Sequence, residues 1–507
     1  MPKVRCTRSA KSQPEDVSPN SFSYFHTFKP YPVKLWAILP ELVLAGLCLG
    51  LVPVAGLVKG RWRAVPGVVA ASGLIACIVL TARMLPWAPV SVFEGTYAVD
   101  GFAHVFKLMI FAGSLLTLFI LGAYFRGKTQ QAHAPVAVLF TTLGSVGLAS
   151  SLDLGLIVLF LQMLSMGIYV LCALVRSDDR ALEAAIKYFI YGAVALAVMA
   201  YGLTFLYGMT GSLDLRVIRS SLAEGGDPLW IGLVLLVVLV GYGFEMTMVP
   251  FHPWAPDVFE GATAAISGFI SVVPKIAAFA GLLRFLVQGL PVDPSHWPLV
   301  VAVFAALTMT LGNLVALWQF TLKRLLAYSS IAQTGYVLMA VAVAERASTA
   351  LPAAGYYLAA FLFMNLGAFA VVAHLERTLG SDSFEALRGL HRRAPGPAVV
   401  LALSLLSLAG FPPLAGFAGK VVILEAALNG GMAWLAVVGI VNMAVALYYH
   451  ARILMVMYMR APVYDYPLPA RFGYALAYGL AGAGTLLLGV VPGPALEVMQ
   501  TLAELLQ

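Results

Sequence analysis

The sequence predicts an all-α integral membrane protein with about fourteen transmembrane helices. Of its 507 residues, 61% are hydrophobic and only 11% are charged, whereas soluble domains carry about 25% charged residues. Apolar stretches recur from Leu35 to Pro492, and each is close to the roughly 20 residues that a helix needs to cross a bilayer. A soluble protein could not cover so many helices that are apolar on all sides.

The expected spans are separated by short polar segments, such as the turn at Asp153 between the fourth and the fifth span. They run over residues 35–57, 64–85, 104–125, 134–152, 154–175, 184–209, 229–250, 263–287, 297–320, 325–344, 352–374, 399–428, 433–459 and 474–491. We therefore expect a polar N-terminal tail over 1–33, three helices over 34–128, a first inverted five-helix repeat over 129–290, a second over 291–462, and the last span with a C-terminal tail over 463–507.

The distribution of charge predicts the orientation. If the N-terminus lies outside the cytoplasm, about fifteen Lys and Arg residues fall in cytoplasmic loops and about six fall outside, which favours this orientation. The net charge of +7 then belongs to these loops, and nucleic acid is not an expected partner. The four cysteines are scattered without a CxxC pair, so we expect no metal or iron–sulfur site in this chain.

Two spans are interrupted by proline. The seventh ends in the segment 249–256 (VPFHPWAP), and the twelfth contains the segment 410–416 (GFPPLAG). Proline removes a backbone donor and stops a helix. Irregular backbone at membrane depth is tolerated where it is buried in protein or lines a wet cavity. Two such breaks, five spans apart, are typical of transporters that are built from inverted repeats.

Four charged residues fall within the expected spans, namely Lys187, Glu245, Lys275 and Lys420. A charge at the centre of the bilayer costs about 2.5–3.5 kcal/mol on insertion scales, so these residues are expected to have partners or a function. Snorkelling towards the headgroups is the competing interpretation, and it fits Lys187 best because Lys187 lies near a helix start. Buried ionisable groups bridged by water can form a proton relay. His252 could support such a relay or serve only as a structural hydrogen-bond donor.

Four segments carry a family resemblance that covers roughly residues 35–491. They are residues 244–262 (FEMTMVPFHPWAPDVFEGA), 322–332 (LKRLLAYSSIA), 363–369 (FMNLGAF) and 410–417 (GFPPLAGF). Together they resemble the antiporter-like membrane subunits of respiratory complex I. Within that superfamily the chain is most similar to subunit N, through Leu39-Pro40-Glu41 before the first span, the segment 99–103 before the third, and Lys420 in the broken twelfth helix. The resemblance implies fourteen helices with two inverted five-helix repeats.

The chain departs from the family pattern at three positions. Gln162 stands where the family has a glutamate, Glu245 where it has a lysine, and Gln333 where it has a histidine. Lys187, Lys275 and Lys420 match the family's lysines. Because the family's glutamate–lysine pair cannot form between Gln162 and Glu245, we expect Glu245 to pair with Lys187 or Lys275 instead. We expect Gln162, His252 and Lys323 to support the relay.

The resemblance implies a proton-translocating subunit of an NADH–quinone oxidoreductase in the inner membrane of a bacterium. Its partners would be the other membrane and peripheral subunits, the lipid bilayer and the proton as substrate. No cofactor is expected in this chain, and NADH, FMN, iron–sulfur clusters and quinone would bind to partner subunits. Three alternatives remain open from the sequence: a subunit of a sodium/proton antiporter, a subunit of a membrane hydrogenase, and a scaffold subunit that does not pump.

Overall fold

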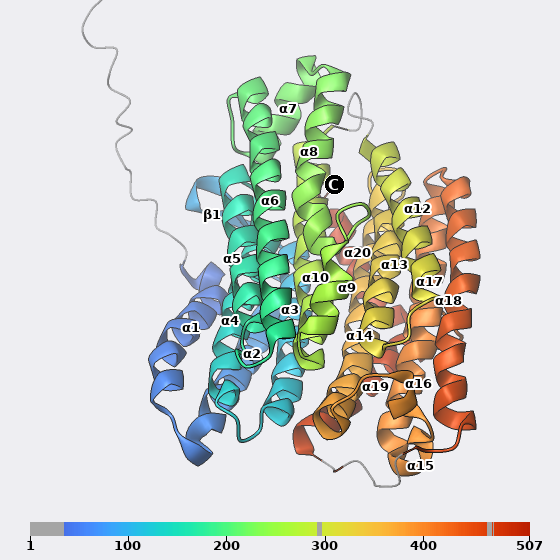
Figure 1. Cartoon of the computed structure of the whole chain (residues 1–507). Coiled ribbons are helices and arrows are strands. Elements are labelled where there is room, and N and C mark those ends of the chain that lie inside the picture. The colour runs from blue at the N-terminus through green and yellow to red at the C-terminus, as the bar shows by residue number, and fades with distance from the viewer. Residues whose placement is uncertain (1–34, 292–296, 464–468, 470, 507) are drawn as a thin grey trace, which may run out of the picture. The chain divides into compact units, whose positions relative to one another are not determined.

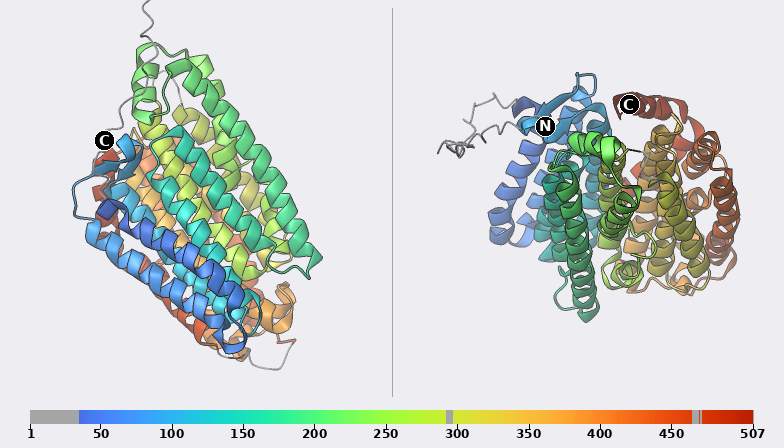
Figure 2. Two further views of the ribbon diagram at one scale, coloured as in Figure 1. Left: turned by 90° about the vertical axis from the view of Figure 1, so that its left-hand side faces the viewer. Right: turned by 90° about the horizontal axis from the view of Figure 1, so that it is seen from above.

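The computed structural model describes residues 35–291, 297–463, 469 and 471–506, and the predicted N-terminal tail lies outside them. Within the described residues, thirteen helices are long and apolar enough to cross a membrane. The predicted twelfth span is instead two shorter helices, α16 (Pro395–Ala409) and α17 (Ala415–Asn429). The helices lie side by side, with α1 and α2 at one edge and α18 at the opposite edge (Figures 1 and 2). The predicted all-α membrane architecture is confirmed.

The first half of the described chain contains ten α-helices and one β-hairpin. The helices are α1 (Leu39–Leu57), α2 (Val65–Met84), α3 (Gly101–Tyr124), α4 (Gln130–Ser150), α5 (Leu154–Cys172), α6 (Asp179–Thr210), α7 (Leu215–Gly225), α8 (Pro228–Met246), α9 (Trp254–Gly261) and α10 (Ala264–Gly289). The hairpin pairs β1 (Val90–Val92) with β2 (Tyr97–Val99) in antiparallel register, with Val90 opposite Val99. Short 3-10 helices cover Leu35–Ile38, Gly60–Ala64 and Phe93–Gly95.

The second half continues in the same manner after residue 296. Its other helices are α12 (Trp297–Ala316), α13 (Leu322–Ala342), α14 (Ala350–Leu379), α15 (Leu390–Arg393), α18 (Ala433–Met459), α19 (Phe472–Val490) and α20 (Gly493–Leu506), with a 3-10 helix at Phe384–Leu387. The boundaries of the two predicted repeats, and the inverted relation between them, stay predictions.

Three further features differ from the sequence prediction. Helix α6 begins five residues earlier than expected, because the Asp178 side chain accepts a hydrogen bond from the Arg180 amide and caps the helix. Helix α7 lies in a segment predicted as a loop. It buries Leu215, Ile218 and Leu222 on one face, a pattern too short and too one-sided to indicate a span. The predicted C-terminal tail contains α20, which packs against α3 and α14.

The most deeply buried helices are α10, α13 and α14. In each, 94% of the most apolar 18-residue stretch is buried inside the protein, compared with 33% in the spans that contain α1, α2, α6 and α19. Helix α10 carries Lys275, and α13 carries the polar side chains that face it. The candidate site therefore lies where the described chain is most completely covered by its own helices.

Both predicted breaks are present, and both begin with a residue in the left-handed region. Helix α8 ends at Met246, Thr247 has a φ of 59°, and α9 begins at Trp254. Helix α16 ends at Ala409, Gly410 has a φ of 89°, and α17 begins at Ala415. Glycine adopts such angles at little cost, whereas a β-branched residue such as Thr247 is strained there.

Candidate functional site: a chain of buried lysines

Lys275 is held by hydroxyl and carbonyl oxygens in the centre of the protein. Its side chain is 2% exposed. The ammonium donates to the Ser330 hydroxyl at 2.6 Å, the Thr247 hydroxyl at 2.7 Å, the Ser330 carbonyl at 3.1 Å and the Thr334 hydroxyl at 3.3 Å. Among the described residues, no carboxylate forms an ion pair with Lys275. The site can therefore bind the ammonium without holding it in a permanent ion pair.

Lys420 has a similar environment in the second broken helix. It is fully buried, and its ammonium donates to the Leu408 carbonyl at 2.8 Å and the Ala409 carbonyl at 3.2 Å. It also lies 4.6 Å from the centre of the Tyr336 ring, which favours a cation. Within the described ranges, Lys420 likewise has no carboxylate partner.

The two lysines share one electrostatic feature, because each lies at the C-terminal end of the first half of a broken helix. Lys275 binds Thr247, which caps α8, and Lys420 binds the last carbonyls of α16. A helix C-terminus carries partial negative charge and carbonyls without intrahelical donors. The breaks thus supply the negative potential that a carboxylate would otherwise provide.

Gln333 on α13 lies between the two lysines. Its amide nitrogen donates to the Leu408 carbonyl at 3.2 Å, which is the same oxygen that Lys420 contacts. Its amide oxygen accepts from the Tyr357 hydroxyl. A cavity of about 10 Å³ is lined by both Lys275 and Gln333, and this volume is at the lower limit for a single water. The cavity and the shared Leu408 carbonyl thus place Gln333 between Lys275 and Lys420. We call these three residues the lysine chain.

Glu245 lies at the end of α8, and its side chain is buried. One carboxylate oxygen accepts from the Ser165 hydroxyl, and the other accepts from the Tyr188 hydroxyl at 3.2 Å. Ser165 lies one turn beyond Gln162 on α5. Ser165 thus makes the contact between α5 and α8. Gln162, the residue of α5 that the sequence analysis singled out, is only half-buried.

The predicted ion pair between Glu245 and Lys187 or Lys275 is wrong. Lys187 instead pairs with Glu183 at 2.7 Å and with Asp257 at 2.8 Å, and its side chain is 36% exposed. Lys187 thus has carboxylate partners on α6 and α9 and is partly exposed. Lys275 donates instead to the hydroxyls of Thr247 and Ser330.

The two remaining supporting residues, Lys323 and His252, have other surroundings. Lys323 donates to the carbonyls of Glu260 at 2.7 Å and Ala262 at 3.0 Å, and pairs with Glu376 at 3.0 Å. It therefore joins the end of α9 to α14, and the contacts given for the described residues do not link it to Lys275 or Lys420. His252 lies in the first break, and its buried Nδ1 has no partner among the described residues.

Sequence reasoning missed Ser165, Thr247, Thr334 and Tyr357. The motif around residue 245 included Thr247, but nothing in the pattern indicated that its hydroxyl would bind a lysine on α10. The spacing of Ser330 and Thr334, four residues apart on one helix face, was the available signal. Tyr357 lies in an apolar run of α14 and gave no signal.

Two further buried ion pairs lie outside the lysine chain. Lys107 on α3 pairs with Glu41 on α1 at 2.5 Å, and Tyr97 donates to the same carboxylate at 2.9 Å. Arg284 on α10 pairs with Asp100 at 2.6 Å. The first pair joins α1 to α3, and the second joins α10 to the residue that caps α3. Each cation has a carboxylate beside it, unlike Lys275 and Lys420.

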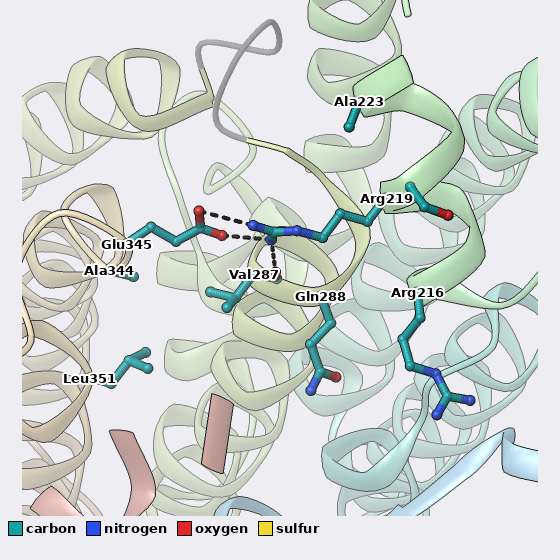
Figure 3. Close-up of a pocket in the computed structure, with 9 residues that line it drawn as sticks. Arg216, Arg219, Ala223, Val287, Gln288, Ala344, Glu345 and Leu351 are labelled. Carbon is teal, nitrogen blue, oxygen red and sulfur yellow. Dashed lines mark hydrogen bonds and ion pairs between the residues drawn. The ribbon is translucent and has the colours of Figure 1, made fainter. Parts of the chain in front are cut away.

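A larger cavity of about 650 Å³ lies at the end of α10, between α7 and the segment after α13. Figure 3 shows Arg219 reaching across it to Glu345, with an N–O distance of 2.7 Å. Val287 and Gln288 line this cavity, and they lie twelve and thirteen residues beyond Lys275 on α10, or roughly 18 Å along the helix. The cavity is therefore separate from the lysine chain.

Comparisons with known proteins show the family to which the chain belongs. Residues 151–446 match a family model described as NADH:quinone oxidoreductase/Mrp antiporter, TM. The NADH-quinone oxidoreductase subunit N 1 of Solibacter usitatus is 40% identical over 415 residues, covering 80% of this chain and 84% of that protein. Subunit N of Desulforamulus reducens is 36% identical over 473 residues, covering 92% and 98%.

Solved structures show the same relationship. A chain of respiratory complex I from Thermus thermophilus superposes with a TM-score of 0.78 at 34% identity, covering 90% of this chain and 98% of that one. A chain of the Mrp complex from Dietzia has a TM-score of 0.81 at 21% identity, covering 93% and 98%, and at that identity it shows the fold alone. This chain belongs to the subunit N family of NADH-quinone oxidoreductases.

Proposed function

We propose that this chain is a proton-translocating membrane subunit of an NADH–quinone oxidoreductase, in the inner membrane of a bacterium. The observation that carries the proposal is the lysine chain, which is formed by Lys275, Gln333 and Lys420. Two fully covered ammonium groups without carboxylate partners are expensive to maintain in a membrane protein. Proton relays are a known use for such groups, since each lysine can be discharged without leaving a buried carboxylate unpaired.

The proposed steps depend on electrostatic coupling between the lysines. A proton that arrives at Lys275 places a positive charge near Lys420, and like charges repel strongly in a medium of low dielectric constant. Lys420 then releases its proton towards the outer side. Water in the cavity between Lys275 and Gln333 would carry the proton, and the amide of Gln333 would orient that water. Glu245, with Ser165 and Tyr188, would supply protons on the Lys275 side.

The energy would come from partner subunits. NADH, FMN, iron–sulfur clusters and quinone are proposed to bind there, and this chain would contribute only the proton path. Lys187 would sit at the flank of that path, in its ion pairs with Glu183 and Asp257. Lys323 would fix α9 against α14 and so hold the first break in position.

The test is the rate of NADH-driven proton pumping in inverted membrane vesicles, divided by the amount of assembled complex. NADH oxidation with an artificial electron acceptor measures the assembled, active enzyme. We expect Lys275→Met and Lys420→Met to lower the pumping rate and to leave that oxidation unchanged. Lys59→Met, in the loop after α1, is the control and should pump normally. Normal pumping in both buried variants would refute the proposal.

The antiporter, hydrogenase and scaffold alternatives have distinct outcomes. A native gel of gently solubilised membranes should place the tagged chain in a large band that oxidises NADH. Migration in a smaller assembly without that activity, with loss of growth at high sodium and alkaline pH after deletion, would indicate an antiporter, and hydrogen-dependent activity would indicate a hydrogenase. A scaffold predicts assembly into the large band with normal pumping in every lysine variant.

A further inference from the structure

The cavity at the end of α10 has no part in the proposed function. Its volume of about 650 Å³ falls within the range of about 300–1,000 Å³ that is typical of sites for small molecules and cofactors. Helix α7, the last turn of α10, the segment after α13 and the first turn of α14 all line it. Its walls come from both halves of the chain, so a ligand there would contact segments that are far apart in the sequence.

The walls of this cavity combine apolar and charged side chains. The buried apolar lining residues are Val287, Ala344 and Leu351. The charged lining residues are Arg216, Arg219 and Glu345, so the arginines outnumber the carboxylate. This composition favours a ligand that has both an anionic group and an apolar part.

Arg219 is held by the protein itself. Its Nη1 donates to the Glu345 carboxylate at 2.7 Å and to the Leu290 carbonyl at 3.2 Å, and it also contacts the Val287 carbonyl. Its Nη2 donates to the other Glu345 oxygen at 3.3 Å. Arg219 thus ties α7 to the end of α10, and Glu345 balances its charge. The cation that remains for a ligand is Arg216.

Arg216 is fixed in position and still has a donor to offer. Asp214, which does not line the cavity, accepts from Nε at 3.1 Å and from Nη2 at 2.8 Å. The Gly95 carbonyl accepts from Nη2 at 3.1 Å. Among the described residues, none accepts from Nη1, and the side chain is 52% exposed. An arginine that is held in place with N–H groups facing a cavity suits the recognition of phosphate.

Gln288 supplies a second donor to the same part of the cavity. Its carbonyl oxygen accepts from Nη1 of Arg284 at 3.4 Å, and for its amide nitrogen no acceptor is found within the described ranges. Figure 3 shows the side chains of Arg216 and Gln288 extending on the same side of the ion pair that crosses the cavity. A guanidinium and an amide can together bind the oxygens of one phosphate group.

The cavity lies at the depth of the lipid headgroups. Broken helices place their binding sites near the bilayer midplane, and Lys275 contacts the first break. Val287 lies roughly 18 Å beyond Lys275 along α10, whereas the hydrocarbon core extends about 15 Å from the midplane. Helix α8 follows α7 after a short turn and exposes Leu229, Trp230 and Leu233 in its first two turns. Such residues are typical of a helix end at the membrane interface, and they offer apolar surface to acyl chains.

We propose that this cavity binds the phosphate group of a phospholipid, with Nη1 of Arg216 and the amide nitrogen of Gln288 as donors. The headgroup lies between α7 and the segment after α13, and the acyl chains follow α8. The lipid thus joins the two halves of the chain at the end of α10. The proposal goes beyond the proposed function, because lipid binding does not depend on proton transfer. A soluble phosphate ester would offer the same chemistry from another source.

The experiment measures photolabelling of the purified, delipidated complex in a sugar detergent, which contains no phosphate. The probe is phosphatidylglycerol with a photoreactive group in one acyl chain, and mass spectrometry of peptides locates the label. We expect label on α7 and α8. Arg216→Gln should raise the half-saturating probe concentration about tenfold, because it removes a charge-assisted hydrogen bond. Arg83→Gln, which changes an exposed arginine in the last turn of α2, is the control and should leave it unchanged.

An unchanged half-saturating concentration in Arg216→Gln would overturn the proposal. If Arg216→Gln does not assemble, Gln288→Met replaces it, because methionine has a similar volume and no N–H donor. Weaker labelling of Gln288→Met at normal assembly supports the proposal, and labelling equal to that of the unchanged protein overturns it.

Two competitors and a second probe identify the source of the phosphate. Unlabelled phosphatidylglycerol should displace the probe, whereas glycerol phosphate and inorganic phosphate should not do so at the same concentration. Displacement by these soluble phosphates would overturn the assignment to a lipid. A photoreactive diacylglycerol, which lacks the phosphate, should label α7 and α8 only weakly. Labelling equal to that of the phosphatidylglycerol probe would show that the cavity does not recognise phosphate, and would overturn the proposal.

Discussion

The Thr247 hydroxyl accepts a hydrogen bond from the Lys275 ammonium over 2.7 Å, while the Thr247 backbone holds a φ of 59°. A non-glycine residue in this conformation costs about 1–2 kcal/mol. The end of α8 therefore keeps a strained residue at the point where its side chain meets the buried lysine. Backbone strain of this kind is common at functional sites. A substitution that relieves the strain and removes the hydroxyl should therefore affect stability and activity differently.

Thr247→Gly separates them. Glycine adopts the left-handed conformation freely, so we expect the thermal stability of the complex to be unchanged or higher, while pumping falls because Lys275 loses a hydroxyl ligand. Thr247→Ser keeps the hydroxyl and should pump normally. Thermal unfolding and pumping rates on the same membranes check both effects. Equal pumping by the glycine and serine variants would show that the hydroxyl has no role.

Glu245→Gln tests the carboxyl group at the Lys275 side of the path. The amide has the same shape and can still accept from Ser165 and Tyr188, so assembly should be normal. An amide does not exchange a proton at neutral pH, so pumping per assembled complex should fall. Glu183→Gln, which removes an exposed carboxyl on α6, is the control and should have the smaller effect. A larger loss of pumping in Glu183→Gln than in Glu245→Gln would show that protons do not enter the path through Glu245.

Asp100→Asn tests the buried ion pair with Arg284, whose side chain is fully covered. Removal of one partner leaves an uncompensated buried charge and costs about 3–5 kcal/mol. We expect the variant to unfold at a lower temperature and to assemble poorly. Asp100→Asn combined with Arg284→Met should recover most of the loss, because no unpaired charge then remains. No recovery in the double variant would show that the pair contributes through its shape and not its charge.

Gly416→Ala tests the backbone contact that closes the second break. A methyl group at Gly416 would lie 1.8 Å from the Ser407 carbonyl oxygen, so the end of α16 and the start of α17 would have to separate. Because Lys420 binds the last carbonyls of α16, we expect loss of pumping, and poor assembly if the shift is large. Gly479→Ala, on α19 with open space around it, should be tolerated. Normal pumping by Gly416→Ala would show that Lys420 does not depend on this geometry.

Much of the fold could be predicted from the sequence, because membrane helices are long and uniformly apolar. The breaks were visible from Pro250 and from Pro412 and Pro413, since proline cannot continue a helix. Helix α7 could not be predicted, because its three buried residues make too short a pattern. The early start of α6 depends on the Asp178 cap, which carries no hydropathy signal.

The candidate site could be predicted only in its charged members. Lys275 and Lys420 stood out because a charge in an apolar span is unusual. Their contacts could not be predicted, since nothing in the sequence shows that Ser330 and Thr334 face Lys275 or that the Leu408 carbonyl faces Lys420. The pairing of Glu245 was predicted wrongly because sequence alone could not show that α9 places Asp257 beside Lys187, or that α13 places two hydroxyls beside Lys275.

The central claim is that Lys275 and Lys420 act in one proton path, and the double variant Lys275→Met with Lys420→Met tests it most directly. Groups that act in series are non-additive, because one block already closes the path. The account predicts that the double variant pumps at the same reduced rate as either single variant, with normal NADH oxidation by the artificial acceptor. A double variant whose loss equals the product of two independent single losses, or any single variant that pumps normally, would contradict it.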